Sequence, residues 1–258
     1  MRVVVLGSGS AGNSVVIESG ERRILIDAGF SCREIERRCA EVGVEAESLE
    51  AIVLTHEHGD HSRGADRLAR RHRIPVFATE GTLAGVRWSE DASEHLVPVA
   101  SGWPYEVAGF SIETFTVPHD ARDPVGLVVE DGRRRKVGLL ADLGTWSRLA
   151  AARLQDVGLL FLETNHELDM LRRGPYPWSL KQRVASGHGG RSNQQAVDGL
   201  PQVLGDELQW VVLYHLSRTN NLPALAAASV GETLERSGSV AAVAVSEQSR
   251  PSEWLEVA

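Results

Sequence analysis

The stretch Thr55-His56-Glu57-His58-Gly59-Asp60-His61 places three imidazoles and two carboxylates within six residues, directly after the apolar run 51–54. Neutral imidazole nitrogens and carboxylate oxygens are the side-chain donors that suit zinc, manganese or iron. The alternative is a polar loop that happens to hold three histidines, but packing alone gives no reason to place so many polar groups together. We therefore interpret the spacing H-x-H-x-D-H as the start of a metal site and look for its remaining ligands.

Length and composition leave room for a substantial hydrophobic core. The chain has 258 residues, which can form one large domain or two small ones, and we expect a single domain over residues 1–258. Its formal net charge of −8 argues against a protein that coats nucleic acid with its whole surface. A local basic groove stays compatible with that charge, because the local field matters more than the total.

The start of the chain and its cysteines indicate a cytoplasmic protein. The apolar start meets Gly7 too soon for a signal peptide, and no apolar run approaches the length of a membrane span. Two cysteines cannot make a disulfide framework, so a reducing compartment is expected. Cys32, Ile35, Cys39 and Val42 fall on one helical stripe, which predicts that both cysteines belong to the core.

A glycine-rich motif near the start suggests a nucleotide site and has to be tested. Gly7-Ser8-Gly9-Ser10-Ala11-Gly12 follows a predicted strand and matches the dinucleotide fingerprint G-x-G-x-x-G. That fingerprint requires a helix directly after it, so that the helix N-terminus can hold pyrophosphate. Residues 13–18 and 23–26 instead form the pattern of a two-stranded hairpin. We therefore predict a tight backbone turn near the active site in place of a dinucleotide site.

Further residues with ligand chemistry follow the ends of predicted strands. These residues are Asp27, His56, His119, Asp142 and His215. In α/β sheets such strand ends tend to share one edge, where ligands gather. Taken alone, His119 or His215 is structural as often as it is a ligand. The placement of all five residues at corresponding strand ends favours one shared site. The last strand of the chain is predicted at 239–245.

Two basic segments are candidates for contact with an anionic substrate. Residues 62–73 look helical, and four of the arginines in this segment (Arg63, Arg67, Arg70 and Arg71) are most simply a solvated helix face. The alternative is a surface that faces phosphate beside the metals. The second segment lies between His166 and Asn193, and it contributes Arg172 and Arg173 as candidate substrate contacts together with Asn193. Since His166 and His188 lie at its borders, we expect at least one of them to act on substrate, although either can equally be structural.

The whole set of motifs resembles the metallo-β-lactamase superfamily. The resemblance rests on H-x-H-x-D-H followed by His119, Asp142 and His215, and it spans essentially the whole chain. It implies an α/β fold (α+β in some schemes), a four-layer αβ/βα sandwich with a binuclear metal site at one edge. The implied ligands form two sets around a bridging residue: His56, His58 and His119; Asp60, His61 and His215; and Asp142 as the bridge. Asp27 would orient one of these ligands from behind the metals.

Within that superfamily the chain is most similar to the YycJ/WalJ-type exonuclease group, whose characterised members are DNA exonucleases. The similarity rests on five motifs: Gly7-Ser8-Gly9-Ser10-Ala11-Gly12-Asn13-Ser14; His119-Asp120-Ala121-x-Asp123-Pro124-Val125-Gly126; Glu163-Thr164-Asn165-His166; Met170-Leu171-x-x-Gly174-x-Tyr176-Pro177; and His215-Leu216-Ser217 with Asn220-Asn221. One departure concerns Gly187-His188-Gly189-Gly190-Arg191-Ser192-Asn193, which is two residues longer than the Gly-His-Leu-Ser-Asn usual in the group. The position of His188 is therefore open.

The resemblance implies a hydrolase that cleaves phosphodiester bonds, with DNA, single- or double-stranded, as the expected substrate. Two divalent cations, zinc or manganese with iron as a third option, would hold a shared water as hydroxide near neutral pH. Asp60 would be a ligand or a base, and we favour the ligand because two metals are expected. The alternatives are a cyclic phosphodiesterase, a carbonyl hydrolase and a non-catalytic binding protein on the same fold. The sequence predicts no membrane partner and leaves the oligomeric state open.

Overall fold

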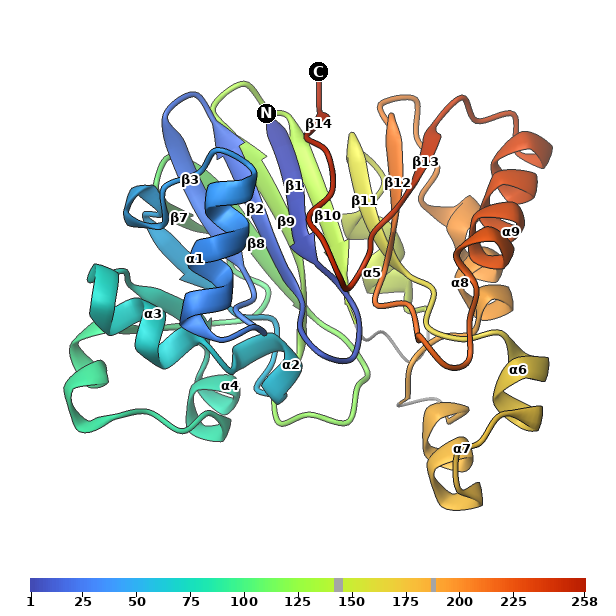
Figure 1. The fold of residues 1–258 in the computed structure, drawn as a ribbon. Helices are drawn as coiled ribbons and strands as arrows, with labels where there is room; N and C mark the ends of the chain where they lie inside the picture. Colours follow the sequence, from blue (N-terminus) through green and yellow to red (C-terminus); the bar gives the residue numbers. More distant parts are fainter. Residues whose placement is uncertain (142–145, 187–188) are drawn as a thin grey trace.

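The computed structural model describes residues 1–141, 146–186 and 189–258, and it contains two sheets of seven strands each. The first sheet is built mainly from the N-terminal half of the chain (Figure 1). Its strands, in spatial order, are β14 (Leu255–Glu256), β1 (Arg2–Gly7), β2 (Ser14–Ser19), β3 (Arg22–Ile26), β4 (Ala51–Val53), β5 (Val76–Thr79) and β6 (Leu96–Val99). Strands β3 to β6 run parallel, so their carboxyl ends share one edge.

The second sheet contains the remaining strands of the described structure. Its strands, in spatial order, are β13 (Ala242–Val245), β12 (Trp210–Tyr214), β11 (Leu159–Glu163), β10 (Lys136–Leu140), β9 (Val125–Asp131), β8 (Phe110–Thr116) and β7 (Tyr105–Val107). Strands β10 to β13 are parallel, and β7 to β10 are antiparallel neighbours. The strands therefore follow one another across the sheet in the order of the sequence, from β7 at one edge to β13 at the other.

Helices cover the outer faces of both sheets. On the first sheet, α1 (Cys32–Glu41) and α3 (Ala65–His72) pack over the outward-facing strand residues. On the second, α5 (Arg148–Arg153), α8 (Asn193–Gly199) and α9 (Pro223–Arg236) do the same. A third apolar cluster fills the space between the sheets. The order helix, sheet, sheet, helix confirms the predicted four-layer α/β sandwich.

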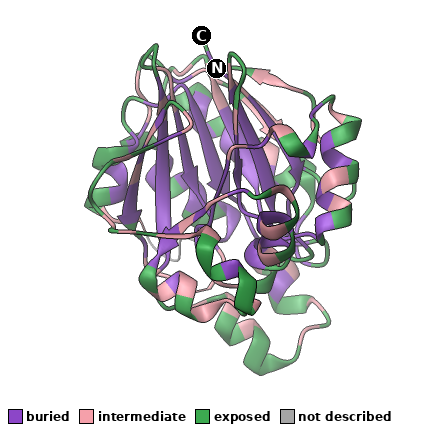
Figure 2. Cartoon of the chain, turned by 90° about the vertical axis from the view of Figure 1, so that its left-hand side faces the viewer, coloured by how far each residue is buried: buried purple, intermediate pink, exposed green. Residues whose placement is uncertain are grey.

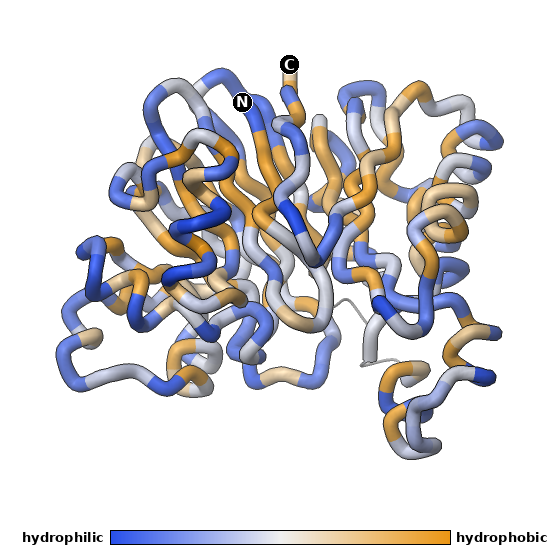
Figure 3. Tube along the Cα trace, viewed as in Figure 1, coloured by the Kyte–Doolittle hydropathy of each residue, from blue (hydrophilic) through white to orange (hydrophobic). Residues whose placement is uncertain are grey.

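The buried strands read as near-continuous apolar runs because helices or the other sheet cover both faces. In β1 and β11, almost every residue is buried. Figure 2 shows this burial in the strands and exposure on the outer helices, and Figure 3 shows that the apolar stretches follow the strands. Both cysteines lie on the buried side of α1, as predicted.

Short strands at the sheet edges were not predicted. The prediction that 239–245 is the final strand is wrong at that point, since β14 follows β13 and pairs with β1. β14 has two residues and β7 has three, which is too short for an alternating pattern to stand out in the sequence. The C-terminal segment thereby connects the edge of the second sheet to the edge of the first.

The glycine-rich motif leads into a strand, as its sequence context predicted. β1 ends at Gly7 and β2 begins at Ser14, so no helix follows the motif. Gly9 has a φ of 141°, a conformation that other residues rarely adopt. The motif is therefore a turn between antiparallel strands, at the end of the sandwich where β3 and β4 also end.

Four short helices lie at that same end of the molecule. They are α2 (Gly59–Ser62), α4 (Glu80–Gly85), α6 (Leu168–Arg173) and α7 (Trp178–Val184). Figure 1 shows α2 and α4 below the first sheet and the pair α6–α7 projecting below the second. Among the described residues, no helix has the length and apolar character needed to cross a membrane.

Candidate metal centre

The ends of three strands bring the predicted histidines together. β4 ends at Val53, and the chain then runs through His56 and His58 into α2, which carries Asp60 and His61. His119 follows the end of β8, and His215 directly follows β12. His215 has a φ of 57°, an unusual backbone conformation for a residue other than glycine. Asp142, the predicted bridging ligand, lies outside the described residues.

The first group of three ligands consists of His56, His58 and His119. One ring nitrogen from each lies within 4.8 Å of the others. Nδ1 of His58 and Nε2 of His119 face each other at 3.3 Å. Two nitrogens bound at about 2.0–2.1 Å in tetrahedral geometry would lie about 3.4 Å apart, so this pair has a spacing that fits a shared cation.

The second group consists of Asp60, His61 and His215, whose ligand atoms also lie within 4.8 Å of one another. Nε2 of His215 is 3.1 Å from Oδ2 of Asp60, and Nε2 of His61 is 3.9 Å from the same oxygen. The rings of His61 and His215 stack with centroids 5.5 Å apart. Two nitrogens and one carboxylate oxygen suit the same borderline metals as the first group. The rings of His56 and His61, 4.2 Å apart, connect the two groups.

Asp27 holds the second group from behind. Its side chain is fully buried, and Oδ2 lies 2.7 Å from Nδ1 of His61. The backbone N–H of Thr55 donates to Oδ1 at 2.9 Å, and the Thr55 hydroxyl donates to Oδ2 at 2.9 Å. A carboxylate at Nδ1 selects the tautomer in which Nε2 presents its lone pair, as in many metal sites. The resemblance implied that Asp27 would orient a ligand, and its contact with His61 is compatible with that role.

Asn13 and Ser8 connect the glycine-rich turn to the second group, and sequence reasoning missed their roles. The Asn13 side-chain amide lies 3.0 Å from Nε2 of His61, and its backbone N–H donates to the Asp60 carbonyl at 2.8 Å. The Ser8 hydroxyl accepts from the backbone N–H of His215 at 2.7 Å and donates to Asn13. A Cβ on Gly29 would lie 1.7 Å from the Asp60 carbonyl oxygen, so only glycine fits there.

A pocket of about 320 Å³ opens onto the two groups. Its lining includes Ser10, His58, Asp60, His119 and His215, together with Tyr176, Leu180, Arg183 and Val184 from α7 and the segment before it. The candidate ligands therefore share one pocket with the α6–α7 segment, which we call the arm (residues 168–184).

Asn165 supports His215 from the floor of this pocket. Its side-chain nitrogen lies 3.1 Å from Nδ1 of His215 and donates to the His215 carbonyl at 3.0 Å. The backbone N–H of Asn165 donates in turn to the Arg191 carbonyl at 2.8 Å. Asn165 belongs to a motif quoted above, but nothing in its spacing indicated that it would contact a ligand.

The predicted substrate residues are placed unequally. His166 is fully buried and does not line the pocket, and burial lowers its pKa to about 4. Asn193 is also buried and donates to Glu167 and Asn221. Arg172 and Arg173 are exposed on the arm, outside the pocket wall. His188 lies outside the described residues.

The segment in which this chain departs from its group is tied to the core by Arg191. The side chain is buried, and its guanidinium lies 4.4 Å from the ring centre of Trp146. Burial lowers the pKa of Arg191 to about 10, while the charge of Glu163 acts in the opposite direction. The Arg191 side chain therefore stays charged at neutral pH. Its backbone carbonyl accepts from the backbone N–H of Asn165, which lines the pocket, so Arg191 also supports the pocket lining.

Cys32, Glu36 and His72 form a further group with ligand chemistry. Nε of Arg71 lies 2.9 Å from the Glu36 carboxylate, and His72 lies at the same distance from it. Burial and the charge of Glu36 raise the pKa of the Cys32 thiol to about 11, which opposes the thiolate that a metal needs. A guanidinium already neutralises the carboxylate, so we assign no metal to this group.

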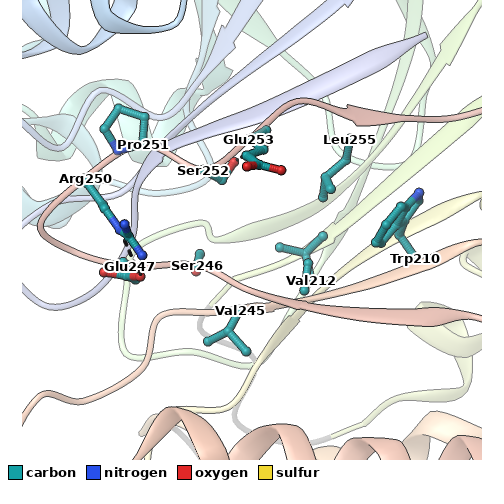
Figure 4. Close-up of a pocket in the computed structure, with 11 residues that line it drawn as sticks. Trp210, Val212, Val245, Ser246, Glu247, Arg250, Pro251, Ser252, Glu253 and Leu255 are labelled. Atoms are coloured by element: carbon teal, nitrogen blue, oxygen red, sulfur yellow. Dashed lines mark hydrogen bonds and ion pairs between the residues drawn. The ribbon is translucent and has the colours of Figure 1, made fainter.

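A hollow of about 460 Å³ elsewhere in the molecule lacks such chemistry. It lies where the C-terminal segment crosses between the sheets (Figure 4). Figure 4 shows Trp210, Val212 and Leu255 at one end and the ion pair of Glu247 with Arg250 at the other. No histidine or cysteine lines it, so the pocket at the two ligand groups is the candidate active site.

Comparisons with known proteins agree with this geometry. Residues 22–194 match the model of the beta-lactamase superfamily domain. An exodeoxyribonuclease YycJ of Bacillus anthracis is 34% identical over 243 residues, which cover 91% of this chain and 89% of that protein. An exodeoxyribonuclease WalJ of Streptococcus pneumoniae is 34% identical over 230 residues, covering 86% and 84%. The crystal structure of the metallo-beta-lactamase fold protein YhfI from Bacillus subtilis superposes with a TM-score of 0.74, at 17% identity over 98% of this chain and 99% of that one.

Proposed function

The chain belongs to the metallo-β-lactamase superfamily, and we propose that within it the protein is a DNA exonuclease that uses two divalent cations to hydrolyse phosphodiester bonds. The observation that carries the proposal is the pair of ligand groups facing one pocket. The identity of about a third to two exodeoxyribonucleases, over most of each chain, supports DNA as the substrate.

The two groups would each hold one cation, zinc or manganese with iron as a third option. His56, His58 and His119 would hold the first, and Asp60, His61 and His215 the second. By the family pattern Asp142 would bridge the two. When bound, such a pair of cations supplies a nucleophilic water near neutral pH and stabilises the charge that develops on the attacked phosphate.

The chain's own residues position the ligands and the substrate. Asp27 holds His61 in the tautomer that presents Nε2, and Asn13 ties the backbone of Asp60 to the glycine-rich turn. We favour Asp60 as a ligand, and its carboxylate oxygen 3.1 Å from Nε2 of His215 supports that role. A phosphodiester in the pocket would lie between the candidate ligands and the guanidinium of Arg183 on the arm. A guanidinium donates hydrogen bonds in a planar geometry that suits phosphate.

The burial of His166 and Asn193 changes the roles that we propose for them. Neither side chain reaches the pocket, so neither can contact substrate in this arrangement. We assign both to support of the pocket floor. Arg172 and Arg173 stay candidate contacts for a strand that continues past the arm, and His188 stays a candidate for protonating the leaving oxygen.

The direct test is an assay with end-labelled DNA. The metal-loaded protein is incubated with single-stranded DNA, double-stranded DNA and a cyclic nucleotide, and the products are separated by length. We expect stepwise shortening of a DNA strand. The variant His119→Ala should lose at least about a hundredfold in rate, because it removes a ligand of the first group. The matched control His95→Ala changes a histidine outside the pocket and should keep the wild-type rate.

The other outcomes of this assay have distinct meanings. Hydrolysis of the cyclic nucleotide alone would replace the nuclease by a small-molecule phosphodiesterase, for which a pocket of this volume is sufficient. Cleavage of no substrate by a protein that has bound two metals would contradict phosphodiester hydrolysis and favour carbonyl chemistry or a binding role.

A further inference from the structure

The arginines that follow α2 differ in whether an acidic side chain neutralises them. Arg70 bonds to Asp66 at 3.2 Å and to Asp91 at 3.1 Å. Arg63 and Arg67 are exposed and make no ion pair with any residue that the structure describes. The sequence suggested a solvated helix face or a phosphate-facing surface as alternatives, and the structure separates the paired arginines from the unpaired ones. Two uncompensated positive charges therefore lie four residues apart in the sequence, one directly after α2 and one in α3.

A third uncompensated cation comes from a different helix. Arg33 is the second residue of α1, is exposed, and has no ion pair within the described part of the chain. It lines a hollow of about 530 Å³ together with Ser31, Cys32, Glu36, Arg67 and Arg71. This convergence of α1 with α3 could not be predicted from the spacing of the arginines along the chain.

The acids near this hollow are already paired. The Glu36 carboxylate bonds to Arg71 and to His72, each at 2.9 Å. Glu34 bonds to Arg37 and to Arg38, and these partners hold its pKa low, at about 2. Consequently Arg33 and Arg67 face the hollow without a neutralising carboxylate, and the N-terminus of α1 adds partial positive charge beside them. In a molecule of net charge −8, these cations make the hollow locally basic.

Arg63 lies close to the metal centre and four residues before Arg67 of the hollow. It directly follows Ser62, the last residue of α2, which carries two candidate ligands. Its Nη1 donates to the Ala11 carbonyl at 3.2 Å, and the neighbouring Ser10 lines the metal pocket. Arg67 lies four residues farther along the chain, in α3, which begins at Ala65 after the turn at residues 63–64. Figure 1 shows α1, α2 and α3 on one side of this end of the sandwich and the arm on the other.

We propose that Arg33, Arg63 and Arg67 form an anchor for the phosphate backbone of a DNA strand, a few nucleotides away from the bond that is cleaved. The inference rests on the proposed function, since it takes the strand end to lie in the metal pocket. Arg33 and Arg67 line one hollow that Arg63 does not line, so a single phosphate in the hollow would not account for all three. Cations spread over α1, α3 and the turn before α3 fit an anion whose charge repeats along its length.

The test is the affinity for strands of two lengths. The double variant Arg33→Ala/Arg67→Ala is compared with wild type by fluorescence anisotropy, using a labelled single strand of about 20 nucleotides and one of about 4. Arg63 is left intact because it bonds to the glycine-rich turn. The matched control Arg133→Ala/Arg134→Ala removes two exposed arginines from the turn between β9 and β10, at the opposite end of the sheets.

The variant should bind the long strand at least about tenfold more weakly, while the control stays within about twofold of wild type. The slope of log Kd against log salt concentration should fall by about 1.4, because each contact with a single strand contributes about 0.7. Affinity for the short strand should stay within about twofold. Equal affinity of variant and control for the long strand would overturn the anchor.

The outcome for the anchor is separable from the outcome for the nuclease. Binding is measured without turnover, so a wild-type protein that binds the long strand through these arginines but never cleaves it would contradict only the proposed reaction. Thermal unfolding of both double variants checks that their folds are intact. Since all four side chains are exposed, we expect melting temperatures close to that of wild type.

Discussion

A fully buried histidine makes the protein sensitive to mild acid at the scale of a single residue. Neither ring nitrogen of His166 has a hydrogen-bond partner among the described residues. Burial lowers its pKa to about 4, so the ring is neutral in the folded protein over the physiological range. The unfolded chain binds a proton at this residue near pH 6.5, well before the folded one does. The free energy of unfolding should therefore fall as the pH falls from about 6.5 to about 4.

The variant His166→Gln tests this pH dependence, because glutamine cannot be protonated. Between pH 7 and pH 5 the wild-type protein should lose about 2 kcal/mol of stability through this residue, and the variant should lack that loss. Urea unfolding at both pH values measures the difference. His95→Gln is the matched control and should follow wild type. Parallel loss of stability in wild type and His166→Gln would show that the ring is protonated without cost.

At the scale of elements, α7 of the arm makes an exposed ion pair with the loop after β8, beside the pocket. Nη2 of Arg183, on α7, lies 2.8 Å from Oδ2 of Asp120, in the loop after β8. No residue of α7 is buried, so packing contributes little to its position. The ion pair can hold the arm in place, or it can keep Arg183 poised until a substrate phosphate replaces Asp120. Exposed pairs contribute little to stability, which favours the second role.

Removing each partner separately distinguishes these roles. If Arg183 binds phosphate, Arg183→Gln should raise KM for DNA about tenfold, the loss expected for one charge-assisted hydrogen bond. Asp120→Asn should leave KM unchanged or lower it, because it removes the competing carboxylate. Steady-state kinetics on one oligonucleotide measures both. Similar increases in KM for the two variants would show that the pair acts only as a structural connection.

Features encoded by a local sequence pattern could be predicted, whereas features that depend on contacts between distant parts of the chain could not. The hairpin after the glycine-rich motif was predicted because no helix pattern follows Gly12. The role of Asn13 depends on its contact with residues 60 and 61, which lie far along the chain, and no local pattern encodes that contact. The burial of Asn193 likewise depends on Asn221, which the sequence did not place beside it.

At the scale of the whole molecule, the two-sheet sandwich brings sites from both halves of the chain to one edge. The first sheet supplies the H-x-H-x-D-H stretch and the second supplies His119 and His215. Strand periodicity predicted most of the strands, but the pairing of the sheets followed only from the resemblance to a family. The net charge of −8 could be predicted from composition alone. The arginine-lined hollow could not, because it forms only where residues of α1 and α3 come together in the fold.

The number of metal ions bound by the chain tests the account most directly. After loading with zinc or manganese and removal of free ions, elemental analysis should find two ions for each wild-type chain. His119→Ala should retain about one, because it removes a ligand from the first group only. His72→Ala, which alters the group with Cys32 and Glu36, should still retain two. A wild-type protein that binds no ions, or a His119→Ala variant that still binds two, would contradict the proposed metal centre.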